Sequence, residues 1–155
     1  MKKIIISLIL LIICSLSWAE NTKGLGVALG PVSAGGISFR KIADDTGHEF
    51  NYIGFGNNSS FTIVLGGKYF KLINSTESSR FYYFGGASAL IEFSKNSEED
   101  LFLNFGAGIG FEFSLREHLR VSFDLPLSFI NVLPAESNDT IISIAIPEIG
   151  IRYYF

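Results

Sequence analysis

The side chains with the most chemistry to offer are charged residues that stand singly among apolar ones. They are Arg40, Lys68, Glu92, Glu112, Arg120, Asp124, Glu148 and Arg152. Their signs balance, so opposite charges gathered on one face of a sheet can pair, whereas an unpaired buried charge is very costly. In an enclosed space such pairs either hold the structure together and close it, or line a small gated pore. We favour the first interpretation.

Other chemistry finds little support in the residue spacing. The only two histidines, His48 and His118, fall in predicted turns, and a serine–histidine hydrolase needs its histidine within hydrogen-bond reach of a nucleophile. No cysteine or paired-histidine spacing predicts a zinc site. The acidic runs at 44–45 and 98–100 are typical of solvated loops. We therefore expect no enzyme activity, no cofactor and no metal.

The elements that position the charges are β-strands. Odd positions from Leu101 to Leu115 are apolar, and even positions from Asn104 to Ser114 are small or polar. A strand sorts such residues onto two faces, whereas a helix scatters them. Extending this pattern predicts eight strands, at about residues 24–30, 35–42, 49–56, 60–73, 80–94, 101–115, 119–131 and 141–155. The segment 49–56 follows neither parity well.

Alternation alone leaves open which face is outside. A soluble barrel or sandwich turns its apolar face inward, and a membrane barrel turns it toward lipid. The polar face carries glycines at 66, 86, 106, 108, 110 and 150, which weaken a strand exposed to water but suit the crowded interior of an eight-stranded barrel. We expect Phe105, Ile109 and Phe123 to face lipid. We expect Gly108, Glu112 and Asp124 to face the lumen.

Aromatic residues point to the same orientation. Five of the six tyrosines fall near one predicted rim, namely Tyr69, Tyr82, Tyr83, Tyr153 and Tyr154. This distribution is typical of an aromatic belt at a membrane interface. Lys71 falls on the lipid face near a strand end, where its ammonium can snorkel to the headgroups. The apolar phase changes after Pro147, which predicts a β-bulge there because proline cannot donate to the ladder.

The amino terminus predicts export. Lys2 and Lys3 precede an apolar run over residues 4–16, and small residues at 17 and 19 predict signal-peptide cleavage after Ala19. Cleavage removes Cys14, the only cysteine, so the mature chain forms no internal disulfide. Its formal charge moves from −3 to about −5 without a basic patch, which argues against nucleic-acid binding. We expect residues 20–155 to form one domain.

The carboxyl terminus, 148–155, reads polar, x, glycine, x, x, aromatic, x, aromatic, through Glu148, Gly150, Tyr153 and Phe155. This pattern resembles the assembly signal on the last strand of bacterial outer-membrane barrels. With the export signal and the eight strands, the chain resembles the small outer-membrane barrels of Gram-negative bacteria, similar to the OmpA transmembrane domain and the OmpX/Ail group. The resemblance implies contact with outer-membrane lipid and lipopolysaccharide, and with periplasmic chaperones and the barrel-assembly machinery.

The sequence thus predicts an all-β protein, an eight-stranded antiparallel up-and-down transmembrane barrel. Its expected role is structural or surface interaction, with a polar, closed lumen. Two alternatives stay open: a narrow channel for ions or small solutes, and a soluble periplasmic lipocalin-like carrier whose apolar face lines a cavity. The predicted outward loops are short apart from 133–140, which argues against a large adhesive surface. No host or surface ligand is identified by the sequence.

Overall fold

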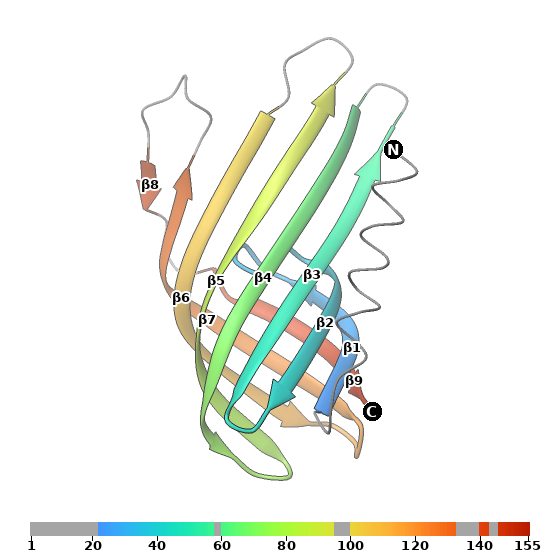
Figure 1. Cartoon of the computed structure of the whole chain (residues 1–155), viewed down its shortest axis with the longest axis vertical. Helices are drawn as coiled ribbons and strands as arrows, with labels where there is room; N and C mark the ends of the chain where they lie inside the picture. The colour runs from blue at the N-terminus through green and yellow to red at the C-terminus, as the bar shows by residue number, and fades with distance from the viewer. Residues whose placement is uncertain (1–21, 58–59, 95–99, 133–139, 143–145) are drawn as a thin grey trace.

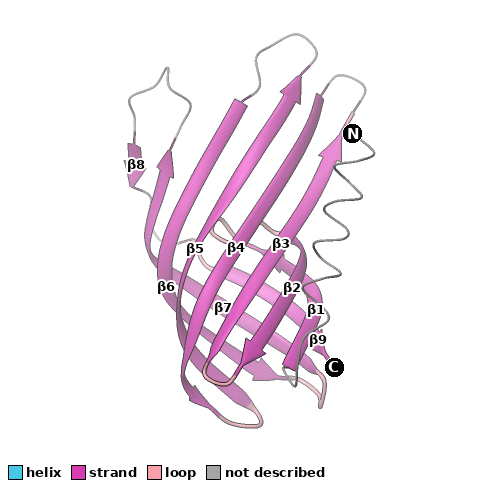
Figure 2. Cartoon of the chain, viewed as in Figure 1, coloured by secondary structure: helices cyan, strands magenta, loops and turns pink. Residues whose placement is uncertain are grey.

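A computed structural model describes residues 22–57, 60–94, 100–132, 140–142 and 146–155 (Figure 1). All regular structure in these ranges is β-strand (Figure 2). The strands are β1 (Thr22–Leu29), β2 (Gly36–Ala43), β3 (Thr46–Gly56), β4 (Ser60–Ser75), β5 (Ser79–Ser94), β6 (Asp100–Ser114), β7 (Leu119–Val132), β8 (Thr140–Ile142) and β9 (Glu148–Tyr154). Within the described ranges no helix has the length and hydrophobicity to cross a membrane.

The strands form one closed antiparallel barrel. From β1 to β7, each strand pairs with its neighbour along the chain, and β9 closes the circle between β7 and β1. β8 and β9 share a single position beside β7 in one register, because Ile142 lies opposite Ile130 and Glu148 lies opposite Asp124. The barrel therefore has eight strand positions, and the predicted fold class is confirmed.

The last predicted strand differs from the expectation. The segment 141–155 is divided into β8 and β9, and Ile146 and Pro147 belong to neither. The predicted register-resetting bulge near Pro147 is wrong, because the pairing with β7 keeps the same register on both sides of the break. Proline lacks the N–H that a ladder needs, so the strand is interrupted there. A register shift lies instead between β6 and β7, where Leu127 is the extra residue.

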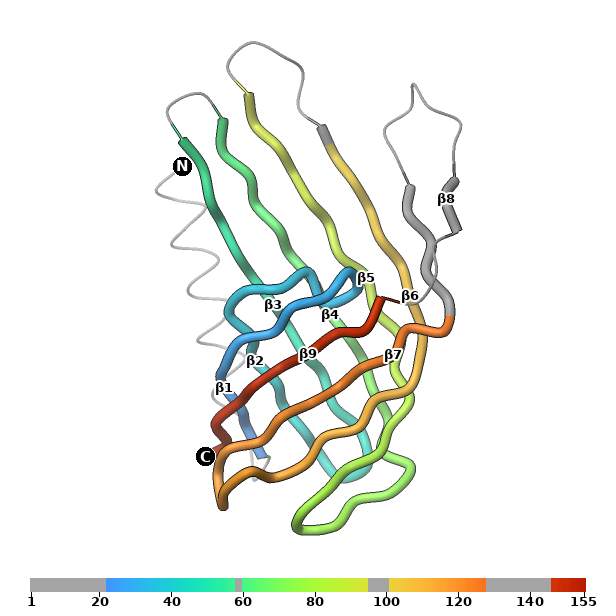
Figure 3. Tube along the Cα trace, turned by 180° about the vertical axis from the view of Figure 1, so that it is seen from behind, coloured from blue at the N-terminus to red at the C-terminus, as the bar shows by residue number. Residues whose placement is uncertain are grey.

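One side of the barrel wall is short. We call the end that carries the β2–β3, β4–β5 and β6–β7 turns and the carboxyl terminus the lower end (Figure 1). β1, β2 and β9 have only 8, 8 and 7 residues, whereas β4 and β5 have 16 each. The β1–β2 connection consequently lies at mid-height, and β3 to β6 continue well above it (Figure 3).

The two faces of the wall are oriented as predicted. Phe105 and Phe123 are 46% and 47% exposed on the outer surface, and Ile109 is half-buried beside them. Glu112 and Asp124 are 1% and 3% exposed, and Gly108 is buried. Apolar side chains therefore face outward and polar ones inward around the lower half of the barrel. This is the reverse of a soluble carrier.

The strand that followed neither parity, 49–56, now has an explanation. β3 begins at Thr46, and its lower half turns Glu49 and Asn51 into the barrel while Phe50 faces out. Ile53 lies opposite the inward position Val64, so the upper half turns an apolar residue inward. The inward positions of this strand are thus polar in its lower half and apolar in its upper half, so hydrophobicity alone does not show which parity faces inward.

Candidate functional site

A network of buried charges fills the lower half of the barrel. Alternation along the strands turns each of these side chains inward, and pairing places neighbours at one level. The cations are Arg40, Lys68, Arg80, Arg120 and Arg152, and the anions are Glu49, Glu112, Asp124 and Glu148. All four carboxylates are at most 3% exposed.

Glu49 is the first centre of this network. Its Oε2 accepts hydrogen bonds from Arg40, with Nε at 2.8 Å and Nη2 closer still. Its Oε1 accepts from Arg152 Nη2 at 2.6 Å and from Asn51 Nδ2 at 2.9 Å. A carboxylate with this many charge-assisted donors is held in one position.

Glu112 is the second centre. Its Oε2 accepts hydrogen bonds from Arg40 Nη1 at 3.0 Å and Tyr154 Oη at 2.6 Å. Its Oε1 accepts from Arg80 Nη1 at 2.9 Å. Arg40 therefore bridges two carboxylates from opposite sides of the lumen, and its guanidinium also lies 4.8 Å from the centre of the Phe70 ring, within cation–π range.

Lys68 joins the remaining two carboxylates. Its Nζ donates to Asp124 Oδ2 and lies 2.8 Å from Glu148 Oε2. Asp124 also accepts a 2.5 Å hydrogen bond from the hydroxyl of Tyr82, which in turn accepts from Arg40 Nη1 at 3.1 Å. The network therefore spans the lumen from β2 to β9.

The β1–β2 connection lies on top of these charges. We call residues 30–35 the inner loop. The amides of Val32 and Ser33 donate to Glu148 Oε1 at 2.5 and 3.0 Å, and both residues are 0% exposed. Ser88 Oγ donates to the carbonyl of Pro31 at 2.7 Å. Two successive amides on one carboxylate form an anion-binding concavity, so Glu148 fixes the loop inside the barrel.

The inner loop fits inside the barrel because a glycine of the wall leaves room for it and because residues 34–36 adopt positive φ angles. A Cβ on Gly66 would collide with the carbonyl of Ser33, so only glycine at that wall position leaves room for the loop. The chain returns to the wall through Ala34, Gly35 and Gly36, with φ of 71°, 76° and 100°. Glycine adopts these angles at no steric cost.

The structure brings together most of the charges chosen from the sequence. Arg40, Lys68, Glu112, Asp124, Glu148 and Arg152 all belong to the network. Arg120 lies at its lower edge, 3.9 Å from Glu112, and donates to the carbonyl of Glu77 at 2.6 Å. Glu92 faces inward opposite Thr62 but near the top of β5, so it lies outside the network and is only half-buried.

Four members of the network are missed by sequence reasoning. Glu49 is hidden in the strand of mixed parity, and Arg80 stands at the uncertain start of its strand. The sequence places Tyr82 and Tyr154 in the outer belt, which is wrong, because they are 1% and 4% exposed inside the barrel. A signal is available, since each tyrosine lies two residues from an inward arginine. The outward tyrosines are Tyr69, Tyr83 and Tyr153.

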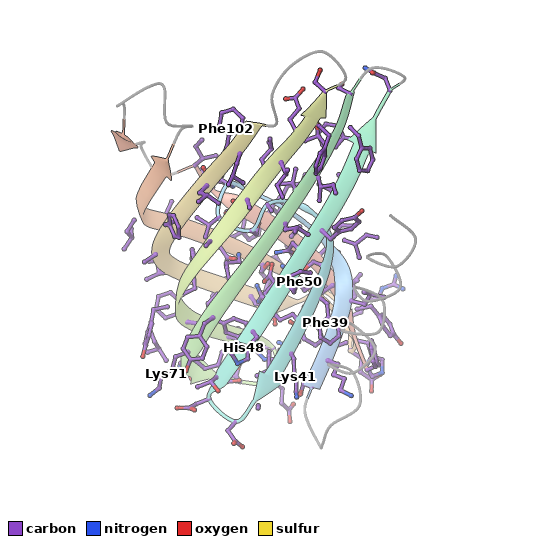
Figure 4. All side chains as sticks on the ribbon, turned by 45° about the horizontal axis from the view of Figure 1, so that its top comes forward. Phe39, Lys41, His48, Phe50, Lys71 and Phe102 are labelled. Atoms are coloured by element: carbon purple, nitrogen blue, oxygen red, sulfur yellow. The ribbon has the colours of Figure 1, made fainter. Side chains whose placement is uncertain are left out.

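Lys41, His48 and Lys71 lie near the lower rim on the outer surface of the barrel (Figure 4). His48 lies 5.2 Å from the Tyr69 ring, and His118 lies 5.5 Å from the Tyr153 ring. Lys71 is 3.6 Å from Asp45, with 45% of its side chain exposed. Within the described residues no three histidine, cysteine, aspartate or glutamate side chains are grouped to hold a metal ion.

The predicted assembly-signal residues divide between the two faces of β9. Glu148 and Gly150 face inward, while Tyr153 and Phe155 are 54% and 64% exposed on the outside. β9 is also the strand that closes the barrel. The aromatic pair Tyr153 and Phe155 is therefore exposed at the lower rim.

Comparison with known proteins adds little beyond the fold. No protein-family model matches the sequence, and a search of curated protein sequences gives no significant match. Among solved structures, the chain is similar to Ail, the attachment invasion locus protein of Yersinia pestis, with 14% identity and a TM-score of 0.48 over 87% of this chain and 97% of that one. At those values the similarity supports no conclusion about function, and the architecture rests on the strand pairing described above.

Proposed function

We propose that this protein is a small β-barrel of the bacterial outer membrane, exported through a cleaved signal peptide. Above the lower rim, its outward side chains are apolar, for example Val27, Ile37, Phe50, Phe111, Phe123 and Ile151, and Tyr69, Tyr83 and Tyr153 mark that rim. An outward apolar band bounded by aromatic residues is what a lipid environment requires of a barrel. In water the same surface would be a large exposed apolar patch, which soluble monomers rarely carry.

The role we propose is structural, with contacts to lipid and lipopolysaccharide rather than transport. The observation that carries this proposal is the filling of the lower lumen by paired charges and by the inner loop. Eight strands enclose a space just wide enough for side chains. We expect ion pairs and a loop in so narrow a space to leave ions no continuous path, so the channel alternative is not favoured.

Cell fractionation combined with a heat-modifiability gel tests the location. We expect the protein in the outer-membrane fraction, with a folded form that migrates differently from the boiled form. Recovery as a soluble periplasmic protein would contradict the membrane assignment. Purified wild-type protein in planar lipid bilayers should give little or no stable conductance. Reproducible ion-selective steps would contradict the closed lumen and leave the location intact.

The assembly signal has its own test. We propose that the barrel-assembly machinery reads Tyr153 and Phe155 on the outer face of β9. Deletion of Phe155, or the double change Tyr153→Ser and Phe155→Ser, should leave unassembled protein in the periplasm. Ile149→Ser, an outward change on the same strand outside the motif, is the matched control. Normal yields of all three variants in the outer membrane would overturn this role.

A further inference from the structure

Above the inner loop, the wall has a short side that falls within the proposed hydrocarbon layer. On β5 the outward residues from Tyr83 to Phe93 cover about 25 Å along the barrel axis, at about 3.3 Å per residue and a tilt near 40°. That is the height of the apolar band of a membrane barrel. On β1, Leu25 lies opposite Tyr153 of the lower rim, and the strand ends at Leu29, only about 10 Å higher.

The inner face of the tall side changes character just above the inner loop. One row of paired residues, Asn51, Gly66, Ser88 and Asn104, is polar or small, and it contacts the loop through Ser88. The next row up is Ile53, Val64, Leu90 and Phe102, each paired with the next across β3 to β6. All four are half-buried. The row above that is Phe55, Thr62 and Glu92, so polar residues bound the apolar row from above on β4 and β5, whereas Phe55 extends it on β3.

The same stretch of sheet is apolar on its outer face. Ile63, Ile91 and Leu101 are paired across β4 to β6 and point outward. An apolar outer face with tyrosines below it is explained by the bilayer. The apolar inner row is not explained by the bilayer unless hydrocarbon also reaches it, because side chains that face water-filled space gain no free energy from burial.

The short side of the wall leaves an opening through which a lipid acyl chain can reach the inner row. Upward of Tyr52, β3 pairs with β4 only, because β2 ends its pairing at Ile37 opposite Tyr52. The edge from Ile53 to Gly56 therefore presents backbone groups that no described strand pairs. An unpaired edge is unfavourable in pure hydrocarbon, but the ester carbonyls and hydrating water of a lipid at that depth can hydrogen-bond to it.

We propose that a lipid of the outer leaflet enters over the short side of the wall and lays an acyl chain along the row Ile53, Val64, Leu90 and Phe102. The row has one inward residue on each of four neighbouring strands, and its length across the sheet is about 14 Å at about 4.8 Å between strands. No charged side chain lies in it. The occupant is thus a single apolar chain with a polar head, and this inference rests on the proposed membrane location.

Quenching of single tryptophans by brominated phospholipid chains tests the proposal. The only native tryptophan is Trp18, which cleavage after Ala19 would remove, and Trp18→Phe in the full chain keeps any uncleaved protein free of tryptophan as well. Phe102→Trp and Leu90→Trp place the probe on the inner row at two positions, in case one variant fails to fold. Ile91→Trp places it outward at a similar height, and Phe84→Trp places it inward below the loop, where Phe84 is 3% exposed.

In vesicles that contain the brominated phospholipid, we expect the Phe102→Trp and Leu90→Trp variants to lose emission to an extent comparable with the outward Ile91→Trp variant. The Phe84→Trp variant should keep its emission, because the inner loop and the charges separate it from lipid. Quenching at position 91 without quenching at 102 and 90 would overturn the proposed acyl-chain site but would remain consistent with a membrane barrel. Failure of quenching at position 91 as well would place the upper half of the barrel outside the bilayer and overturn the acyl-chain site, while cell fractionation decides the membrane location separately.

Discussion

The lower and upper halves of this barrel are built on the same strands but solve opposite problems. Below the inner loop the wall is complete, and the interior is a network of ion pairs whose four carboxylates are at most 3% exposed. Above it the wall lacks one side, and the interior facing the gap is apolar at Ile53, Val64, Leu90 and Phe102. A closed wall allows charged side chains inside the barrel, because buried ion pairs need a space from which lipid is excluded.

The largest expected effect comes from removing one anion of the network. Glu49→Ala leaves Arg40 and Arg152 without their shared carboxylate, which should lower the free energy of unfolding by about 3–5 kcal/mol. Glu92→Ala, in the upper half, should change it by about 0.5 kcal/mol or less. Urea titration of both variants in lipid vesicles measures the difference. Equal losses would mean that the two halves are energetically alike.

Arginine on the outer face tests how far the membrane extends. Phe105→Arg should cost about 2–4 kcal/mol, because Phe105 faces outward opposite Ala87, near the middle of the apolar band. Ile63→Arg, on the tall side of the wall above the short strands, should cost about 1–2 kcal/mol, since the penalty declines toward the interface. The same vesicle titrations apply. No cost at position 63 would place the upper half in water.

Substitutions at two adjacent glycines of β4 test whether the inner loop packs against the inner face of the wall. Gly66 faces inward against Ser33, whereas a Cβ on Gly67 would meet only the carbonyl of Glu49, at 3.7 Å. Gly66→Ala should destabilise the barrel by about 1–3 kcal/mol through overpacking and raise its bilayer conductance as the loop shifts. Gly67→Ala should be neutral or stabilise by about 0.5–1 kcal/mol. Identical behaviour of the two would contradict the inward position of the loop.

Loss of a single hydroxyl distinguishes the inner face of the lower half from its outer face. Tyr82→Phe removes a hydroxyl that donates to Asp124 and accepts from Arg40, and should cost about 1–3 kcal/mol. Tyr83→Phe changes a hydroxyl on the outer surface, 48% exposed, and should cost about 0.5 kcal/mol or less. The urea midpoints of unfolding of the two variants show which tyrosine faces inward. A larger loss at position 83 would reverse the orientation given to β5.

The success of sequence reasoning follows the regularity of each strand. β6, and β7 up to Pro126, alternate without interruption, so their faces and the inward positions of Glu112 and Asp124 can be read directly. The faces of β3 cannot be read from its pattern, because its inward residues are polar in the lower half, as at Glu49, and apolar in the upper half, as at Ile53. Tyr82 and Tyr154 are misplaced because tyrosine is amphipathic and suits a wet rim and a polar interior equally well.

By itself, the sequence determined the all-β class, eight strand positions and the inward face of the regular strands, because period-two patterning is a local property of the chain. It also identified most of the charges that have to find partners, although not Glu49 and Arg80. Only the tertiary structure decided which partners they found, such as Lys68 between Asp124 and Glu148, because pairing across a barrel depends on register and closure. It likewise decided that residues 30–35 turn inward, since the two amides that bind Glu148 lie more than a hundred residues from it along the chain.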